Sequence, residues 1–264
     1  MKTTLPRIAL WLALALVLWF AAAVFGPKFG LIEWPFALGT MVRQLGPIFI
    51  GIVALVALVA LIVALIGKPK GSWGRALFAL AIPAAFMAGL ASVSATAESV
   101  PPIHDVTTDP ADPPMHSAAI LAERERIDAN PLRGFDTPLG EYEEWKGSDV
   151  AGKTSAQLIA DSFPDVQPLG TTADPAAALE AVMAGMEAIG LSGVTSDAEA
   201  GTAQGVAETF LFGFKDDVAA RVRPGEDGGS VIDFRSTSRV GLSDLGYNAD
   251  RIVKLRAAVA EQLP

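Results

Sequence analysis

Three long apolar stretches without a single charged residue lie within the first 97 residues, and they constrain the fold of this chain more than any other feature. They cover residues 8–25, 47–66 and 76–97. An α-helix needs about 20 mostly apolar residues to cross the roughly 30 Å hydrocarbon core of a bilayer, and each stretch has that length. The sequence therefore predicts three transmembrane helices, with the lipid bilayer as the first expected partner.

The charge balance changes sharply at Glu98. Seven basic residues and one acidic residue precede it, whereas 13 basic and 28 acidic residues make up the charge from Glu98 onward. This contrast predicts a membrane region over 1–97 and a soluble domain over 98–264. We expect no nucleic-acid partner, because phosphate binding needs clustered basic residues. The chain has no cysteine, which excludes disulfides and cysteine-ligated zinc, and no cofactor is expected.

Lysine and arginine in the short loops predict the orientation of the membrane region. Five basic residues flank the first span or join the second to the third, against two in the loop after the first span: Lys2, Arg7, Lys68, Lys70 and Arg75 against Lys28 and Arg43. The N-terminus is therefore expected in the cytoplasm and the acidic domain outside it, as in a bacterial inner-membrane protein with a periplasmic domain. Alternatively, residues 1–25 are a cleaved signal peptide, since small residues follow their apolar run.

Proline and helix-capping residues divide the soluble part. The proline-rich segment 98–116 is expected to be an extended linker, because proline interrupts helices and strand ladders. A short helix is expected over 117–130 and a loop over 131–155. A clear helix is expected over 174–190, with Asp174 as N-cap, Pro175 at the first helical position and Gly190 just past its end. A last helix is expected over 248–263, with Asn248 as its N-cap.

Between these two helices the apolar period changes from about 3.6 to two, which is typical of strands. Residues 206–214 would place Phe210, Phe212 and Phe214 on one face. Residues 218–223 and 230–240 alternate in the same way around a turn at "PGEDGG". The sequence therefore predicts an α+β domain, in which an antiparallel sheet has a polar face and a phenylalanine face covered by the helices.

The polar face of this sheet is the main candidate for a binding site. Alternation places five charged residues on it: Arg221, Arg223, Asp233, Arg235 and Arg239. Guanidinium groups suit carboxylate or phosphate, so we expect an anionic envelope ligand or a partner protein here, with Asp244 as a further candidate. The alternative is a solvated face whose charges form cross-strand ion pairs, with Asp244 in a turn that leads into the last helix.

His104 and Asp105, in the proline-rich segment, are the candidates for metal binding or acid–base chemistry. Their spacing matches no zinc motif, and no motif singles out a nucleophile. A binding module that is not an enzyme is therefore the main hypothesis. The alternatives are a hydrolase or metal-assisted enzyme that uses His104 and Asp105, and a membrane scaffold whose three spans form the working interface.

Four blocks occur in the order typical of one family: "PPIHDVTTDPADPP", "FPDVQPL", "FGFKDDVAARVRP" and "DFRSTSRVGLSDLGYNADRI". From about Pro101 to its end, the chain resembles the bacterial and plastid family known as domain of unknown function 1499. The resemblance implies a membrane-associated protein without an established activity, cofactor or catalytic residue. It also suggests testing five residues: His104, Asp105, Arg235, Arg239 and Asp244. His116 stands where the family pattern suggests an aromatic residue.

Overall fold

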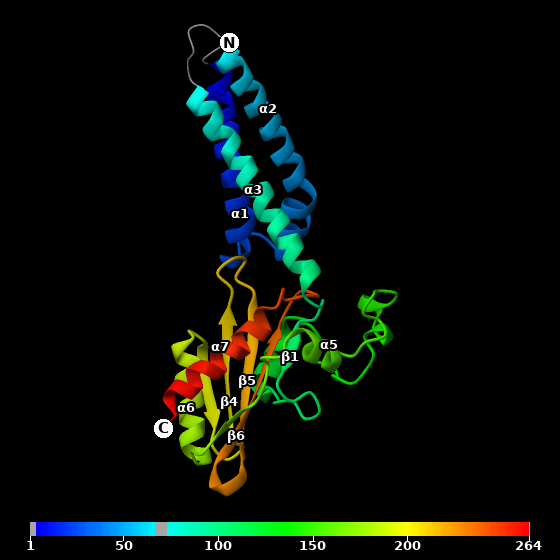
Figure 1. Cartoon of the computed structure of the whole chain (residues 1–264), viewed down its shortest axis with the longest axis vertical. Helices are drawn as coiled ribbons and strands as arrows, with labels where there is room; N and C mark the ends of the chain where they lie inside the picture. The colour runs from blue at the N-terminus through cyan, green and yellow to red at the C-terminus, as the bar shows by residue number, and fades with distance from the viewer. Residues whose placement is uncertain (1–3, 67–72, 264) are drawn as a thin grey trace. The chain divides into compact units, whose positions relative to one another are not determined.

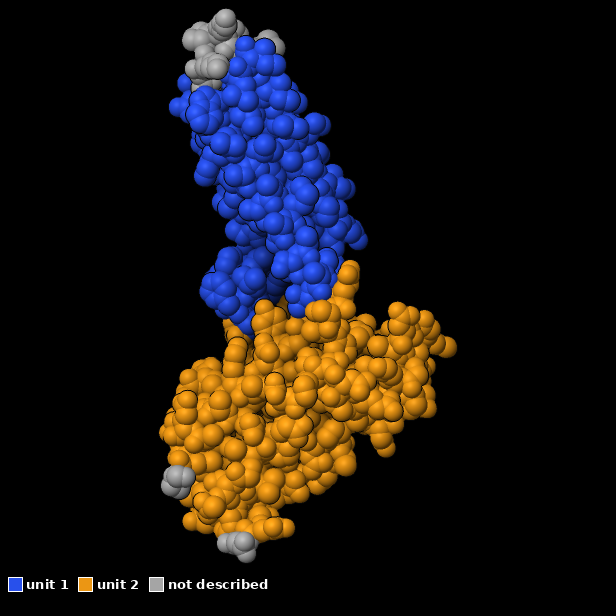
Figure 2. Space-filling model, viewed as in Figure 1, with its two compact units in different colours: residues 1–96, 209–213 blue, residues 97–208, 214–264 orange. Residues whose placement is uncertain are grey.

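The structure is a computed structural model that describes residues 4–66 and 73–263. It divides into two compact units, which Figure 2 distinguishes by colour. Unit 1 comprises Met1–Thr96 together with Thr209–Gly213, and unit 2 comprises Ala97–Glu208 and Phe214–Pro264. Each unit has its own buried apolar cluster and is described separately below.

Unit 1 is built from long apolar helices (Figure 1). They are α1 (Thr4–Lys28), α2 (Gly46–Ile66), which directly follows the π-helical segment η1 (Phe36–Leu45), and α3 (Trp73–Ser99). All three spans, with η1 and α2 counted as one, are long and apolar enough to cross a membrane. The prediction of three apolar helices in the N-terminal region is confirmed.

The packing within unit 1 is the reverse of that in a water-soluble bundle. Small side chains, among them Ala13, Ala57 and Ala76, are fully buried between the helices, whereas Leu18 and Leu55 are exposed. Small residues allow helices to approach closely where lipid supplies no hydrophobic driving force between them, and large apolar side chains then face the lipid. This pattern indicates association with a membrane.

Unit 2 contains a six-stranded antiparallel sheet. Its strands are β1 (Asp105–Thr107), β2 (Leu169–Thr171), β3 (Ser192–Asp197), β4 (Thr202–Glu208), β5 (Lys215–Pro224) and β6 (Ser230–Ser238). The order is β1-β6-β5-β4-β3, and β2 also pairs with β6, next to residues 230–232, whereas β1 pairs with residues 235–237. The expected α+β fold is confirmed.

Four α-helices and three short 3₁₀ turns surround this sheet. The α-helices are α4 (Ala118–Arg126), α5 (Ser155–Ser162), α6 (Pro175–Ala188) and α7 (Tyr247–Gln262). The 3₁₀ turns are η2 (Leu139–Glu141), η3 (Glu143–Trp145) and η4 (Glu226–Gly228). Two of the turns, η2 and η3, lie in the segment 131–155 that we expected to be a loop.

Helices α6 and α7 pack on one face of the sheet (Figure 1). Val182 of α6 and Ile252 of α7 meet Phe234 of β6 in the main core, and all three side chains are fully buried. The helices approach each other closely at Gly185, where an added Cβ would lie 2.7 Å from Val259 Cγ2. A larger residue at this position would therefore push the two helices apart.

The predicted caps of α6 are confirmed. The Asp174 carboxylate accepts hydrogen bonds from the backbone N–H groups of Ala176 and Ala177, and Pro175 occupies the first helical position. Gly190 follows the helix with φ of 80°, a left-handed conformation that glycine adopts without steric penalty. These residues set the length of α6 and so the extent of its core face.

The strand predicted over 206–214 is wrong in its second half. β4 ends at Glu208 and β5 begins at Lys215, so Phe210 and Phe212 lie in the loop that joins the two strands. Phe212 has φ of 65°, which is not a strand conformation. The phenylalanine face therefore does not exist, and Phe234 fills the core instead.

The predicted N-cap of the last helix is also wrong. α7 begins at Tyr247 with Gly246 as its N-cap, so Asn248 lies inside the first turn. Its side chain is fully buried, where it accepts a hydrogen bond from the Ser236 hydroxyl and donates to Ser238 Oγ and to the His104 carbonyl. Asn248 ties α7 to β6 and to the chain that precedes β1.

The proline-rich segment 98–116 does more than link two regions. It contains β1, which pairs with β6, and its Ile103 and Val106 side chains are buried in the main core. The segment therefore places His104 and Asp105 firmly within unit 2.

Candidate functional site

The predicted arginines do lie on the polar face of the sheet, but carboxylates surround them. Asp233 of β6 is fully buried and faces β5. Its Oδ2 accepts hydrogen bonds from Arg223 Nε at 2.7 Å and from Arg221 Nη2 at 3.2 Å. Asp109 and Asp112, from the turn after β1, add further ion pairs to the same two arginines. Three carboxylates therefore more than offset the charge of two guanidinium groups.

Arg235 belongs to a second group of charges, centred on β1. It forms a bidentate pair with Asp105, with Nε–Oδ1 at 3.0 Å and Nη2–Oδ2 at 2.6 Å. The Thr237 hydroxyl donates to Asp105 Oδ1 at 2.6 Å, and its oxygen lies 3.2 Å from His116 Nε2. Burial lowers the pKa of His116 to about 4, so this ring is neutral at pH 7.

Arg239 belongs to a third group, and here sequence reasoning missed its partners. Asp217 of β5, which is fully buried, accepts from Arg239 Nε and Nη2 and, at 2.7 Å, from Arg124 Nη1 of α4. Arg124 is itself buried, on the side of α4 that faces the sheet. The sequence signal that could have revealed Arg124 is a charged residue on the inward face of a short helix.

These groups have the geometry of the cross-strand ion pairs considered above as the alternative, but the expected solvated face is wrong there, because Asp233, Arg235 and Arg239 are buried. Buried pairs of this kind hold the chain in one arrangement, because removing one partner leaves an uncompensated charge that costs about 3 to 5 kcal/mol. Anion binding by Arg221, Arg223, Arg235 or Arg239 stays a prediction, and a ligand there would have to displace an existing carboxylate.

Asp244 lies elsewhere, at the start of α7. Its carboxylate accepts the backbone N–H groups of Gly246 and Asn248, both at 2.8 Å. Burial raises the pKa of Asp244 to about 6, against the opposing effect of these two hydrogen bonds. Its contacts are those of a residue that stabilises a helix start, which is the turn role considered above; its role in binding stays untested.

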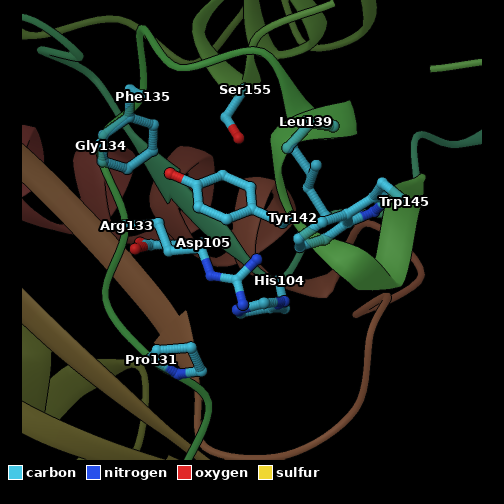
Figure 3. Close-up of a pocket in the computed structure, with 11 residues that line it drawn as sticks. His104, Asp105, Pro131, Arg133, Gly134, Phe135, Leu139, Tyr142, Trp145 and Ser155 are labelled. Carbon is cyan, nitrogen blue, oxygen red and sulfur yellow. The ribbon is translucent and has the colours of Figure 1, made fainter. Parts of the chain in front are cut away.

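A shallow pocket beside β1 gathers a different set of residues (Figure 3). The cavity itself has a volume of only about 20 Å³, and the hollow around it opens to solvent. His104 and Asp105 line one side, and Arg133, Tyr142 and Trp145 come from the segment between α4 and α5. The pocket thus joins the predicted pair with three residues that sequence reasoning missed.

His104 lies against the indole of Trp145, with ring centroids 6.1 Å apart and the planes 17° from parallel. Its Nδ1 is 3.4 Å from the Leu242 carbonyl oxygen, and burial lowers its pKa, so the ring is neutral at pH 7. The Asp105 carboxylate is engaged by Arg235 and Thr237 rather than by His104. An acid–base role for this pair stays a prediction.

Arg133 is the cation of the pocket. Its guanidinium carbon lies 3.9 Å from the Tyr142 ring centroid and 5.3 Å from that of Trp145, within cation–π range (Figure 3). Both terminal nitrogens donate to Glu144, at 3.1 and 2.7 Å, and these hydrogen bonds lower the pKa of Glu144. Glu144 is 45% exposed, so this pair meets solvent.

One signal for the pocket was available in the sequence. Trp145 is the sole tryptophan after residue 97. It is buried, and its indole N–H donates to the Pro102 carbonyl at 2.8 Å, which fixes the ring against the chain that leads into β1. The segment 131–155 hid this role, because its glycine, proline and charged residues led us to expect a loop there.

No metal site is evident among residues 4–66 and 73–263, where no three His, Asp or Glu side chains lie close enough together to hold an ion. Metal binding by His104 and Asp105 therefore stays a prediction, and the described residues offer no third ligand beside them.

A family model described as a protein of unknown function (DUF1499) matches residues 105–259. The matched range begins at β1 and ends in α7, so it covers the sheet, its polar face and the pocket apart from Ile103 and His104. No curated protein and no solved structure matches the chain.

Proposed function

We propose that the C-terminal domain of this chain is a binding module for an anionic group of an envelope component. The chain belongs to the DUF1499 family and carries three candidate membrane spans. The binding position is the Arg133 pocket, defined as Arg133, Tyr142, Trp145 and His104 with the carboxylate of Glu144. The basic loops of the membrane region favour an extracytoplasmic domain, where envelope components are accessible.

The observation that carries this proposal is that the carboxylate paired with Arg133 is exposed enough for a ligand to replace it. Asp105 and Asp217 hold Arg235 and Arg239 in buried pairs, whereas the carboxylate that pairs with Arg133 is about half exposed. Exposed pairs contribute only about 0 to 1 kcal/mol, so a ligand carboxylate or phosphate can replace Glu144 at little cost. The guanidinium would meet the ligand already oriented by two aromatic rings.

The other pocket residues suit such a ligand. Neutral His104 offers a ring that donates or accepts a hydrogen bond without adding charge. Tyr142 and Trp145 provide apolar surface for a ring or chain attached to the anionic group. The pocket is shallow and open, which fits a ligand that remains attached to a larger envelope molecule.

Native mass spectrometry of the full chain, purified in detergent from its own membranes, tests the proposal. The wild-type protein should carry an added mass that Arg133→Ala loses. Arg126→Ala is the matched control, because Arg126 also forms an exposed pair with a glutamate, Glu123, but lies outside the pocket. Retention of the mass by Arg133→Ala, or its loss from both variants, would show that the pocket does not bind it.

A further inference from the structure

The loop that joins β4 to β5 (Figure 1) is apolar, whereas hairpin loops are usually polar. Its sequence, "TFLFG" at Thr209–Gly213, contains no Asn, Asp or Pro. Phe210 is 73% exposed and Leu211 is 50% exposed. Two adjacent large apolar side chains at an exposed loop are unfavourable in water, and such surfaces mark contact with a protein or a membrane.

The turn conformation does not explain these residues. Phe212 and Gly213 have φ of 65° and 66°, in the left-handed region. Glycine and asparagine adopt this region readily, whereas a bulky aromatic residue does not. The loop belongs to unit 1, where the Phe212 N–H donates to the Val24 carbonyl and the Phe210 ring centroid lies 5.8 Å from that of Phe25, near the end of α1. Phe210 and Leu211 nevertheless remain exposed beside this candidate span.

Strand register shows which end of the sheet carries this loop. Glu208 pairs with Lys215 at the end of the β4–β5 ladder, and Asp216 pairs with Ser238 at the end of β6. β1 is antiparallel to β6, and the Ser238 N–H donates to the carbonyl of His104, just before β1. The chain thus enters the domain at the same end of the sheet from which the loop projects.

Only a short stretch of chain joins the third candidate span to β1. The third candidate span ends at Ser99, and β1 begins at Asp105. Six residues of extended chain cover at most about 20 Å. The end of the sheet that carries the loop is therefore close along the chain to the third candidate span.

Two further exposed side chains lie at this end. Leu242 is in the loop that follows β6, and Tyr247 is the first residue of α7. Tyrosine, with an apolar ring and a polar hydroxyl, suits the boundary between water and lipid. The two exposed side chains of the loop, Phe210 and Leu211, define what we call the apolar end, and Leu242 and Tyr247 belong to unit 2.

We propose that the apolar end inserts into the headgroup region of the bilayer that holds the three spans. The domain then has a second attachment besides its covalent tether, which limits its rotation. This inference concerns the surface at the end of the sheet and is independent of any ligand in the Arg133 pocket, so each proposal can fail alone.

The absence of cysteine from the chain allows a site-specific test. Leu211→Cys, labelled with an environment-sensitive fluorophore, is compared with Glu226→Cys in the β5–β6 turn. β5 has ten residues, so the control label lies about 30 Å away at the opposite end of the strand. Both full-length proteins are reconstituted into phosphatidylethanolamine–phosphatidylglycerol vesicles, with and without lipids that carry a nitroxide quencher near the headgroup.

Insertion predicts that the label at position 211 loses most of its fluorescence to the quencher lipids and that its emission is shifted to the blue, whereas the label at 226 shows neither effect. Leu211 is outside the core, so the substitution leaves the domain folded. Equal quenching at the two positions would overturn the proposal. Quenching at 211 without a blue shift would also overturn it, because the loop would then lie near the lipid but remain in water.

Discussion

The two faces of the sheet in unit 2 are stabilised by different physics. On one face α6 and α7 bury apolar side chains around Phe234, and on the other face carboxylates and guanidinium groups pair beneath the chain that contains α4. Apolar packing responds gradually to small changes in volume. Buried ion pairs respond abruptly, because the loss of one partner leaves a charge without compensation.

The largest effect is expected from Asp217→Asn. This substitution preserves the size of the side chain but leaves Arg124 and Arg239 without their shared carboxylate, which should destabilise the domain by about 3 to 5 kcal/mol. Hydrogen exchange of the β6 amides in the full chain measures the change in the free energy of opening.

Asp161→Asn is the matched control for this comparison. Asp161 pairs with Lys153, and both side chains are at least half exposed, so the change should cost less than about 1 kcal/mol. If the two variants were equally stable, the ion pairs beneath α4 would not stabilise the polar face as described.

The dependence of stability on pH should separate two buried groups with opposite effects. The folded pKa of His116 is about 4 against a usual 6.5, so its contribution rises as pH increases through this interval. The folded pKa of Asp244 is about 6 against a usual 3.8, so its contribution falls as pH increases from about 4 to 6. Each shift corresponds to at most about 3 kcal/mol.

A single substitution at either residue removes its contribution to the pH dependence of stability. Relative to wild type, the slope of stability against pH between 4 and 6.5 should become more positive in Asp244→Asn and more negative in His116→Gln. Urea unfolding of the detergent-solubilised chain at several pH values, followed by circular dichroism, measures the slopes. Unchanged slopes in both variants would contradict the assigned environments.

A smaller effect is expected on the apolar face from Gly185→Ala. The new Cβ would lie 2.7 Å from Val259 Cγ2 and 3.0 Å from the Val259 backbone nitrogen, so α6 and α7 must separate slightly. Overpacking of this kind costs about 1 to 3 kcal/mol. Gly152→Ala, with no atom within 4 Å of its added Cβ, is the control and should be nearly neutral in thermal unfolding.

The smallest effect on stability is expected from Glu144→Gln. The pair with Arg133 is exposed, so its loss should change the free energy of unfolding by less than about 1 kcal/mol. The same change removes the carboxylate that competes for Arg133, so the amount of co-purified ligand should equal or exceed that of wild type. A reduced amount would mean that Glu144 contributes to binding rather than competing with the ligand.

The elements with regular apolar period could be predicted from sequence. The three apolar helices, α6 with both its caps, and the strands β5 and β6 follow the expected spacing. β3 could not be found in this way, because it is an edge strand with mostly exposed side chains. The apolar alternation of Phe210 and Phe212 was misleading, since those residues form an exposed loop rather than a core face.

The site was harder to predict, because its partners are distant in sequence. Alternation placed Arg235 and Arg239 on the polar face, but nothing local indicates that Asp105 pairs with the first and Asp217 with the second. The Arg133 pocket forms only because a period-free segment folds back against β1. Tertiary contacts of this kind leave no periodic trace in the sequence.

The most direct test of the account compares Arg133→Ala with Arg223→Ala by native mass spectrometry of the full chain from its own membranes. Arg223 is 43% exposed and belongs to the face that the sequence singled out, but its partner Asp233 is fully buried. The account predicts that Arg223→Ala retains the bound mass and Arg133→Ala loses it. Loss from Arg223→Ala with retention in Arg133→Ala would show that the polar face, and not the pocket, is the binding site.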